Sequence, residues 1–289
     1  MRDHMVRILT EDGALRASAA VTTALVEETR RRQGTDPTAT VALGRLVTGA
    51  ALFGGLLKGR QRLGLSIEGN GPLQKLQAET DADGHLRATV KVPCPNLPPR
   101  DGTFDVAGAI GKAGFLHVVK DLGLKEPYRG MVQLYRSTIA EDLAYYLTTS
   151  EQTPSTVALG VYLETEGKVA AAGGFLVQAM PGGDESRLPL LEERLKALPP
   201  ITALLREGFG PEQILEQIFA GIPFAVKTRT DLAFRCSCNR RQVLNLLLAL
   251  GKEELLQLAR QAEPASVTCE YCKERYAFTA EELEALAVD

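Results

Sequence analysis

The sequence predicts an α+β protein with three parts: an N-terminal core of antiparallel sheet and helix, a helical linker region and a small C-terminal domain. Strand-like segments separated by turn residues alternate with helical patterns up to about residue 180. Short helical patterns split by prolines and glycines follow from residue 181. Four of the five cysteines then lie close together near the C-terminus. These observations divide the chain into residues 1–180, 181–230 and 231–289.

Composition and charge exclude several classes of protein. The 289 residues are 45% hydrophobic and 24% charged, as in a globular protein with a substantial core. The net charge of -3 leaves no surplus of cations, so neither nucleic acid nor an anionic membrane is an expected partner. The start, MRDHMVRILTEDG, has no apolar signal segment, which favours a cytoplasmic location. The apolar stretch 39–57 carries Arg45 and is expected to be a buried helix, because a charge within a membrane span is costly.

The first predicted elements are a hairpin and a helix. Residues 6–21 alternate in polarity around Asp12-Gly13, a dipeptide typical of hairpin turns. A helix over residues 22–32 follows, and Gly34 suits the left-handed conformation that often comes after a helix. The core therefore begins with two strands and a helix.

A long helix and a sheet are predicted next. Asp36 and Pro37 suit the N-cap and the first position of the long apolar helix. Turn residues then separate five strand-like segments, which are RLGLSIEGNGP, LQKLQAETDADGH, LRATVKVP, FLHVVKD and GMVQLYR. Together they predict an antiparallel sheet.

The core is predicted to end with one more helix and one more hairpin. Thr138 and Glu141 form a capping-box pattern at the start of an amphipathic helix that runs to about Thr149. Residues 155–180 form the predicted hairpin, with its turn at Glu166-Gly167. These elements complete an α+β domain.

The linker region contains two predicted amphipathic helices, over residues 188–198 and 211–220, the second ended by Gly221. Their apolar stripes consist of Leu190, Leu191, Leu195, Leu198, Ile214, Leu215, Ile218 and Phe219. The stripes fit a helical layer packed permanently on the core. They also fit a cover that can detach.

Nucleotide-binding and hydrolase motifs are not found. GAIGKAG at residues 108–114 has the wrong glycine spacing for a phosphate-binding loop, and Ala113 replaces the Ser or Thr that would hold magnesium. EGNGPLQ lacks the spacing of a dinucleotide-binding loop, so both segments are predicted to be turns. The three histidines are scattered, with no recognisable nucleophile beside them. No nucleotide and no catalytic residue is therefore expected.

Two cysteine pairs predict a metal site. Cys236 and Cys238 form CxC, and Cys269 and Cys272 form CxxC after a long intervening stretch. In a reducing cytoplasm such clusters indicate metal ligands or redox centres before structural disulfides. Four soft sulfur ligands in two close pairs are typical of a structural zinc site, so one Zn²⁺ per chain is expected. Cys94 lies outside both clusters and is expected to be a bystander.

The C-terminal domain is expected to depend on this metal. Two short helices with a break at Gly251 separate the cysteine pairs, and Tyr276 and Phe278 could pack over the metal. Thr279 and Glu282 form a capping box for a last helix. So short a domain buries little apolar surface, whereas zinc contributes roughly 10–16 kcal/mol to the folding of zinc-finger peptides. Removal of zinc should therefore unfold the domain.

Oxidation of the cysteines would remove this constraint. Zinc ties CxC to CxxC across a long loop. By the loop-entropy relation for disulfides, closing this loop stabilises the folded domain by roughly 3–4 kcal/mol. Disulfides between near neighbours would consume the four ligands without restoring the long-range tie. Five cations surround the ligands, and they fit either a solvated face or a partial offset of the thiolate charge; they are Arg235, Arg240, Arg241, Lys273 and Arg275. The pattern predicts a redox switch.

The chain resembles the heat-shock protein 33 family of redox-regulated, zinc-containing holdase chaperones. The resemblance covers nearly the whole chain and is carried by FRCSCNRRQV, CEYCKERYAF, GNGPL, GMVQLYRSTIAEDLAYYLTTSEQTPSTVALGV and GGFLVQAMPGG. The combination of CxC with CxxC at this distance is unusual among zinc modules. Asn239 stands where the family often has serine, and either residue can cap a helix.

The resemblance implies a function and a set of site residues. Zinc would be bound in the reduced protein by Cys236, Cys238, Cys269 and Cys272. Peroxide with heat, or hypochlorite, would release it and form the disulfides Cys236-Cys238 and Cys269-Cys272. The linker would then loosen, and the exposed apolar surface would hold unfolding client proteins without ATP. Active members of the family are usually homodimers.

Two other functions remain open from the residues alone. A thiol-disulfide oxidoreductase would use Cys269 and Cys272, but it needs a thioredoxin-like context that PASVTCEYCKERY does not obviously provide. A zinc-ribbon nucleic-acid binder is disfavoured by the pI of about 5.8. The expected function is that of a chaperone, not an enzyme.

Overall fold

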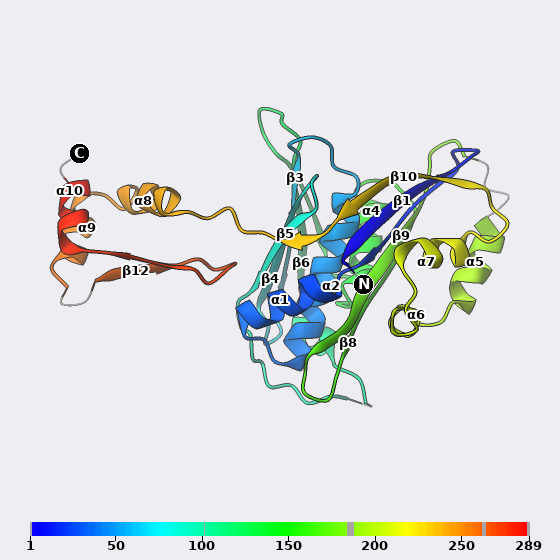
Figure 1. Cartoon of the computed structure of the whole chain (residues 1–289), viewed down its shortest axis with the longest axis horizontal. Helices are drawn as coiled ribbons and strands as arrows, with labels where there is room; N and C mark the ends of the chain where they lie inside the picture. The colour runs from blue at the N-terminus through cyan, green and yellow to red at the C-terminus, as the bar shows by residue number, and fades with distance from the viewer. Residues whose placement is uncertain (1, 101, 184–187, 262–263, 288–289) are drawn as a thin grey trace. The chain divides into compact units, whose positions relative to one another are not determined.

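The structure, a computed structural model, describes residues 2–100, 102–183, 188–261 and 264–287. The chain divides into two compact units, Met1–Arg235 and Cys236–Asp289. Both units contain helices and strands, and the predicted α+β class is confirmed (Figure 1). None of the helices in these ranges has the length and hydropathy that a bilayer span requires.

A five-stranded antiparallel sheet of the first unit has the order β10-β1-β2-β9-β8. Its strands are β1 (His4–Thr10), β2 (Leu15–Val21), β8 (Ser155–Leu163), β9 (Val169–Ala179) and β10 (Phe224–Asp231). Both predicted hairpins, β1–β2 and β8–β9, are confirmed, with left-handed Gly13 and Gly167 in their turns. Strand β10 was not predicted; it lies in the region interpreted as helical linker and pairs with β1.

A six-stranded sheet has the order β11-β5-β4-β3-β6-β7. Its strands are β3 (Arg62–Gly69), β4 (Lys75–Asp81), β5 (His85–Val90), β6 (Gly114–Asp121), β7 (Tyr128–Gln133) and β11 (Ala233–Phe234). The five strand-like segments of the sequence thus form the predicted antiparallel sheet. The short β11 adds one parallel pairing beside β5, which was not predicted.

The two sheets share a core with the helices α1 (Thr23–Gln33), α2 (Pro37–Gly54), α3 (Val106–Ile110) and α4 (Ala140–Thr149). Helix α2 packs against strands of both sheets, and most of its side chains are buried, as the sequence predicted. The predicted helix ends are also confirmed. Gly34 is left-handed after α1, and the Asp36 carboxylate accepts a hydrogen bond from Ala39 N at 2.8 Å.

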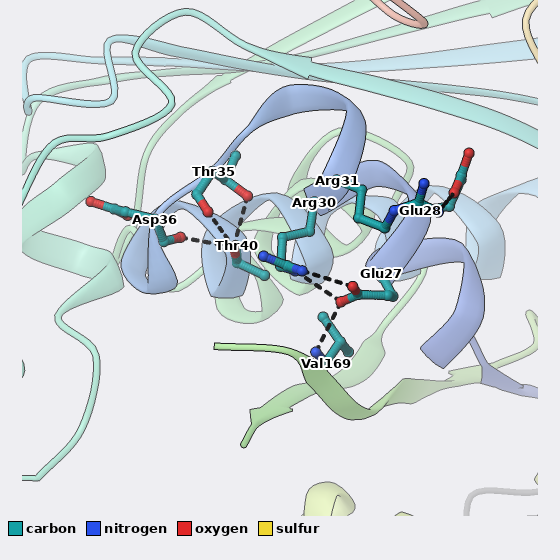
Figure 2. Close-up of polar contacts among 8 residues, drawn as sticks. All are labelled: Glu27, Glu28, Arg30, Arg31, Thr35, Asp36, Thr40 and Val169. Atoms are coloured by element: carbon teal, nitrogen blue, oxygen red, sulfur yellow. Dashed lines mark hydrogen bonds and ion pairs between the residues drawn. The ribbon is translucent and has the colours of Figure 1, made fainter. Parts of the chain in front are cut away.

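Polar side chains fix the connection between α1 and α2 (Figure 2). Arg30 binds the Glu27 carboxylate through two nitrogens at 2.8 Å, and the same carboxylate accepts from Val169 N of β9 at 3.0 Å. The hydroxyls of Thr35 and Thr40 lie 2.7 Å apart. Helix α1 is thereby tied both to the five-stranded sheet and to the first turn of α2.

The start of α4 differs from the prediction. Helix α4 begins at Ala140, with Ile139 as its N-cap. Thr138 does accept a hydrogen bond from Glu141 N at 3.2 Å, but the main capping group is the fully buried Asp142. Its carboxylate accepts from the backbone N–H groups of Tyr135, Arg136, Ser137 and Ile139 at 2.8–3.1 Å.

Three helices cover the face of the five-stranded sheet opposite α2: α5 (Leu188–Ala197), α6 (Ile201–Arg206) and α7 (Pro211–Ile218). In Figure 1 all three helices lie on the same side of β9 and β1, with α5 drawn farther from these strands than α7. Helix α6 was not predicted, and α7 ends at Ile218 instead of Ala220. The buried side chains beneath them include Val6, Ile8, Phe175 and Val177 of the sheet. The three-part division of the chain stays a prediction, and in this structure the helices pack within the first unit.

The second unit consists of α8 (Arg240–Leu248), α9 (Lys252–Ala259), a hairpin of β12 (Ala265–Thr268) and β13 (Arg275–Phe278), and α10 (Ala280–Leu286). The predicted break at Gly251 and the predicted capping box are confirmed. Gly251 has φ 93°, and Thr279 and Glu282 exchange hydrogen bonds at 2.9 and 3.3 Å. The small core of the second unit is built around Val243, Leu247, Leu255, Phe278 and Leu283.

Candidate metal centre

Four cysteine sulfurs meet within the second unit. Cys236 Sγ lies 3.7 Å from Cys269 Sγ, and Cys238 Sγ lies 3.2 Å from Cys272 Sγ. All four sulfurs lie within 4.8 Å of one another, and all four side chains are half-buried thiols. The structure thus brings the two sequence motifs together in one cluster that could hold a metal ion.

The CxC segment is positioned by the helix that follows it. Asn239 is the N-cap of α8, and its side-chain oxygen accepts from Gln242 N at 3.0 Å. This bond fixes the direction in which the chain leaves Cys238. The departure from serine at position 239 therefore preserves the cap, as the sequence predicted.

The CxxC segment forms the tight turn between β12 and β13. Lys273 N donates to Cys269 O at 2.9 Å, and Cys269 N donates to Glu274 O at 2.9 Å. Lys273 adopts the left-handed conformation with φ 63°. The turn also aims the backbone N–H of Glu274 at the Cys272 sulfur. Sequence reasoning identified the two cysteines but not these backbone contacts.

Without a counter-charge the cluster favours neutral thiols. Burial raises the pKa of the Cys272 thiol to about 12, and burial also raises the pKa of Cys238. A thiolate is the form that binds a metal ion, and a divalent cation among four sulfurs reverses the balance by stabilising the thiolates. The donor set is therefore suited to a soft divalent cation and poorly suited to four free thiolates.

An aromatic side chain lies directly beside the cluster. Tyr276 Oη is 3.3 Å from Cys238 Sγ, and this hydrogen bond raises the pKa of the Tyr276 phenol. Phe278, two residues along the same strand, is fully buried in the core of the unit. Of the two aromatic residues expected near the metal, Tyr276 thus makes a direct contact with a sulfur.

Two of the five cations near the cysteines have other partners. Arg240 donates to Ala277 O at 2.8 Å and to the Glu282 carboxylate at 2.5 Å, and its guanidinium lies 4.3 Å from the centre of the Phe278 ring. Arg235 lies 3.1 Å from His85 Nε2 in the first unit. These contacts give both arginines structural roles.

Two further features of the first unit bear on metal binding. Asp81, Asp83 and His85 lie within 4.8 Å of one another. Both nitrogens of His85 already face partners, Asp81 at 3.1 Å and Arg235 at 3.1 Å, so the imidazole has no nitrogen left for a metal. Cys94 is exposed and its thiol donates to Gly34 O at 3.3 Å.

Comparison with known proteins covers the whole length of the chain. The family model described as Hsp33 protein matches residues 3–279. A protein from Syntrophotalea carbinolica named 33 kDa chaperonin is 66% identical over 99% of both chains. Another of that name, from Geobacter sulfurreducens, is 55% identical over 98% of this chain and 94% of its own length.

A solved structure has the same fold. The crystal structure of a 33 kDa chaperonin, a heat shock protein 33 homologue from Thermotoga maritima, superposes with a TM-score of 0.92. It is 39% identical to this chain, and the match covers 99% of this chain and 98% of the other. With a family match over nearly all residues, this chain belongs to the Hsp33 protein family.

Proposed function

We propose that this protein is a redox-regulated, ATP-independent holdase chaperone and not an enzyme. The observation that carries the proposal is the cluster of four thiols within a small unit of its own. The name 33 kDa chaperonin of the relatives supports a chaperone function. The regulation is inferred from the chemistry of the cysteines and from the family resemblance.

In the reduced state, Cys236, Cys238, Cys269 and Cys272 would hold one zinc ion. Two sulfurs bound to zinc at about 2.3 Å in tetrahedral geometry lie about 3.8 Å apart; the Cys236–Cys269 separation of 3.7 Å agrees with this value, and the Cys238–Cys272 separation of 3.2 Å is shorter. When bound, zinc would supply a cross-link between the start of α8 and the β12–β13 turn. The small core of this unit would otherwise have to hold these segments together by itself.

Oxidation would remove the ligands. All sulfurs lie within reach of one another, and the proposed disulfides, Cys236-Cys238 and Cys269-Cys272, follow the pairing that the resemblance implies. Sulfurs paired in this way no longer bind a cation. Because each disulfide closes a loop of only a few residues, neither replaces the long-range tie, and the second unit would unfold.

The surface that would hold clients lies under α5–α7. These helices and the sheet face beneath them bury one continuous apolar cluster. Loosening of the helices would expose both faces, and contiguous apolar surface larger than a few hundred Å² is typical of protein-binding sites. We propose unfolding proteins as the partners, a homodimer as the active form, and the cytoplasm as the location.

The oxidoreductase alternative is weakened by the position of CxxC. Cys269 and Cys272 lie in the turn of a β-hairpin. Dithiol enzymes place the reactive cysteine at a helix N-terminus, which lowers its pKa. Here burial raises the pKa of Cys272 instead.

The proposal is tested by following zinc content and chaperone activity in one preparation. The reduced protein should hold one zinc per chain and leave the aggregation of a heat-unfolded reporter unchanged. After peroxide at elevated temperature, zinc should leave and light scattering by the reporter should fall without ATP. Cys94→Ser should behave as wild type, whereas Cys272→Ser should lose zinc without oxidant. Zinc release with no holdase activity would contradict the proposal.

A further inference from the structure

We propose that the Tyr276 hydroxyl protects Cys238 against oxidation, and so sets the oxidant level at which the cysteine cluster opens. The motivating observation is the 3.3 Å contact between Tyr276 Oη and Cys238 Sγ. Tyr276 is thus a positioning residue that acts on the cluster through a sulfur. The inference rests on the proposed function, which it deepens by naming a residue that tunes the redox response.

The hydroxyl is held in place by the hairpin. Tyr276 pairs with Val267 across the β12–β13 ladder, and its ring packs against the core of the unit. Its neighbour Ala277 is anchored through its carbonyl oxygen, which accepts from Arg240 at 2.8 Å. The half-buried phenol therefore reaches the sulfur from a strand fixed on both sides.

The direction of the hydrogen bond follows from the state of the sulfur. A thiol and a phenol can each donate, but a thiolate, the form that binds a metal, can only accept. In the metal-bound cluster Tyr276 must therefore be the donor. A charge-assisted hydrogen bond of this kind is stronger than a neutral one and takes up electron density on the sulfur.

This electron density is what an oxidant attacks. With hydrogen peroxide, a sulfur lone pair forms an S–O bond, the O–O bond breaks, and the departing hydroxide is protonated to water, leaving a sulfenic acid. A second cysteine sulfur then attacks the sulfenic sulfur; the S–S bond forms, and the S–O bond breaks as a second water leaves. Two thiols and one peroxide thus give one disulfide and two waters, with two electrons passing from sulfur to oxygen. A donor on Cys238 Sγ slows the first step at that atom.

The same bond supports the ligand set before any oxidant arrives. Groups that hydrogen-bond to metal ligands orient them, and their loss typically lowers metal affinity by roughly 10–100-fold. Removing the hydroxyl is therefore expected to weaken metal retention as well as to speed oxidation. Both effects lower the oxidant concentration at which the second unit opens.

The experiment compares full-length, reduced, zinc-loaded wild type with Tyr276→Phe, which keeps the ring and removes only the hydroxyl. Tyr145→Phe, in the first unit, is the matched control. Zinc transfer to a chromogenic chelator is followed with and without peroxide, and modification of each cysteine by iodoacetamide is followed by mass spectrometry. In Tyr276→Phe, zinc release in peroxide should be roughly tenfold faster, and Cys238 modification should accelerate more than that of the other cysteines.

A second variant tests the opposite direction. Site-specific 3-fluorotyrosine at position 276 has a more acidic hydroxyl, which is a stronger donor, and zinc release should be slower than in wild type. Equal release rates and equal Cys238 modification in wild type and both variants would overturn the inference while leaving the proposed function standing. If wild type bound no zinc, the proposed function would fail, and that result is distinct from failure of the inference alone, in which wild type binds zinc and releases it at the same rate as both variants.

Discussion

At the scale of single residues, Asp142 shows what one buried carboxylate can stabilise. The loop before α4 holds Ser137 and Ile139 in the left-handed region, with φ 59° and 73°. A β-branched residue is rarely found there, because its side chain crowds the backbone. The four N–H groups that donate to Asp142 compensate for this conformation.

Asp142→Ala should therefore destabilise the first unit strongly. The substitution leaves the buried N–H groups of Ser137 and Ile139 without an acceptor, and each unsatisfied buried group costs about 1–3 kcal/mol. We expect a loss of about 3 kcal/mol or more in urea unfolding followed by far-UV circular dichroism. Glu141→Ala, one residue away and exposed, is the control and should cost less than about 1 kcal/mol. Equal losses in the two variants would contradict the role assigned to Asp142.

The sequence pattern could not identify Asp142 as the capping residue. Thr138 and Glu141 have the capping-box spacing and do form the local hydrogen bond. The decisive contacts depend on the backbone angles of Ser137 and Ile139, which no residue pattern specifies. The meeting of the four cysteines in one cluster could be predicted, because two closely spaced cysteine pairs are a pattern typical of metal sites.

At the scale of elements, a polar contact holds the start of α7 on the sheet. Glu212, in its first turn, contacts His4 of β1 at 3.3 Å and forms an ion pair with Arg229 of β10. The sequence predicted the apolar stripe of α7 but not this contact, because its partners come from strands far apart in the chain. The unpredicted β10 supplies one of them.

The pH dependence of this contact follows from the pKa of Glu212. Burial raises that pKa, but hydrogen bonds from its own backbone N–H and from His4, and the charges of His4 and Arg229, outweigh burial and lower it overall. Because the carboxyl binds a proton less readily in the folded than in the unfolded protein, its contribution is complete above the unfolded value of about 4.3. It is lost as pH falls through the lower pKa of the folded protein.

Glu212→Gln should therefore destabilise the first unit at pH 7 but not in acid. We expect a loss of about 0.5–1.5 kcal/mol at pH 7, since the contact is partly exposed to solvent. Below about pH 4 the difference from wild type should shrink toward zero. Urea unfolding at a series of pH values measures this difference in unfolding free energy. Glu216→Gln, in the same helix, is the control. A difference that persists unchanged in acid would show that the charge of Glu212 is not its cause.

At the scale of the whole molecule, the two units should respond differently to removal of metal. The first unit has an extensive core shared by two sheets, whereas the second has a small apolar core and, by our proposal, a metal cross-link at the cysteine cluster. A strong chelator acting on the reduced protein should abolish the backbone amide protection of α8, α9 and the β12–β13 hairpin. Amide protection in β1–β6 should persist. Hydrogen exchange by mass spectrometry measures both, and readdition of zinc should restore the protection. If the amide protection of the hairpin survived metal removal, the proposal that the second unit needs the metal to stay folded would be contradicted.

The overall architecture was predictable to different degrees in its parts. The hairpins, the long buried helix and the antiparallel sheet follow from alternation and turn residues, which act over short distances along the chain. The return of β10 to β1 was not predictable. Residues Ala225–Arg229 of β10 are all exposed, so buried and exposed positions do not alternate along them. The pairing also joins the first strand of the first unit to a strand more than 200 residues later in the chain.

That return has a mechanical consequence for α5–α7. The chain leaves the sheet after β9 and rejoins it at β10, and β1 and β2 lie between these two strands. The segment that contains the three helices is therefore attached to the same sheet at both of its ends. If they lift while β9 and β10 stay paired, they remain at high local concentration over the face they left. The return of the three helices to the sheet would then be unimolecular, so its rate would not depend on protein concentration.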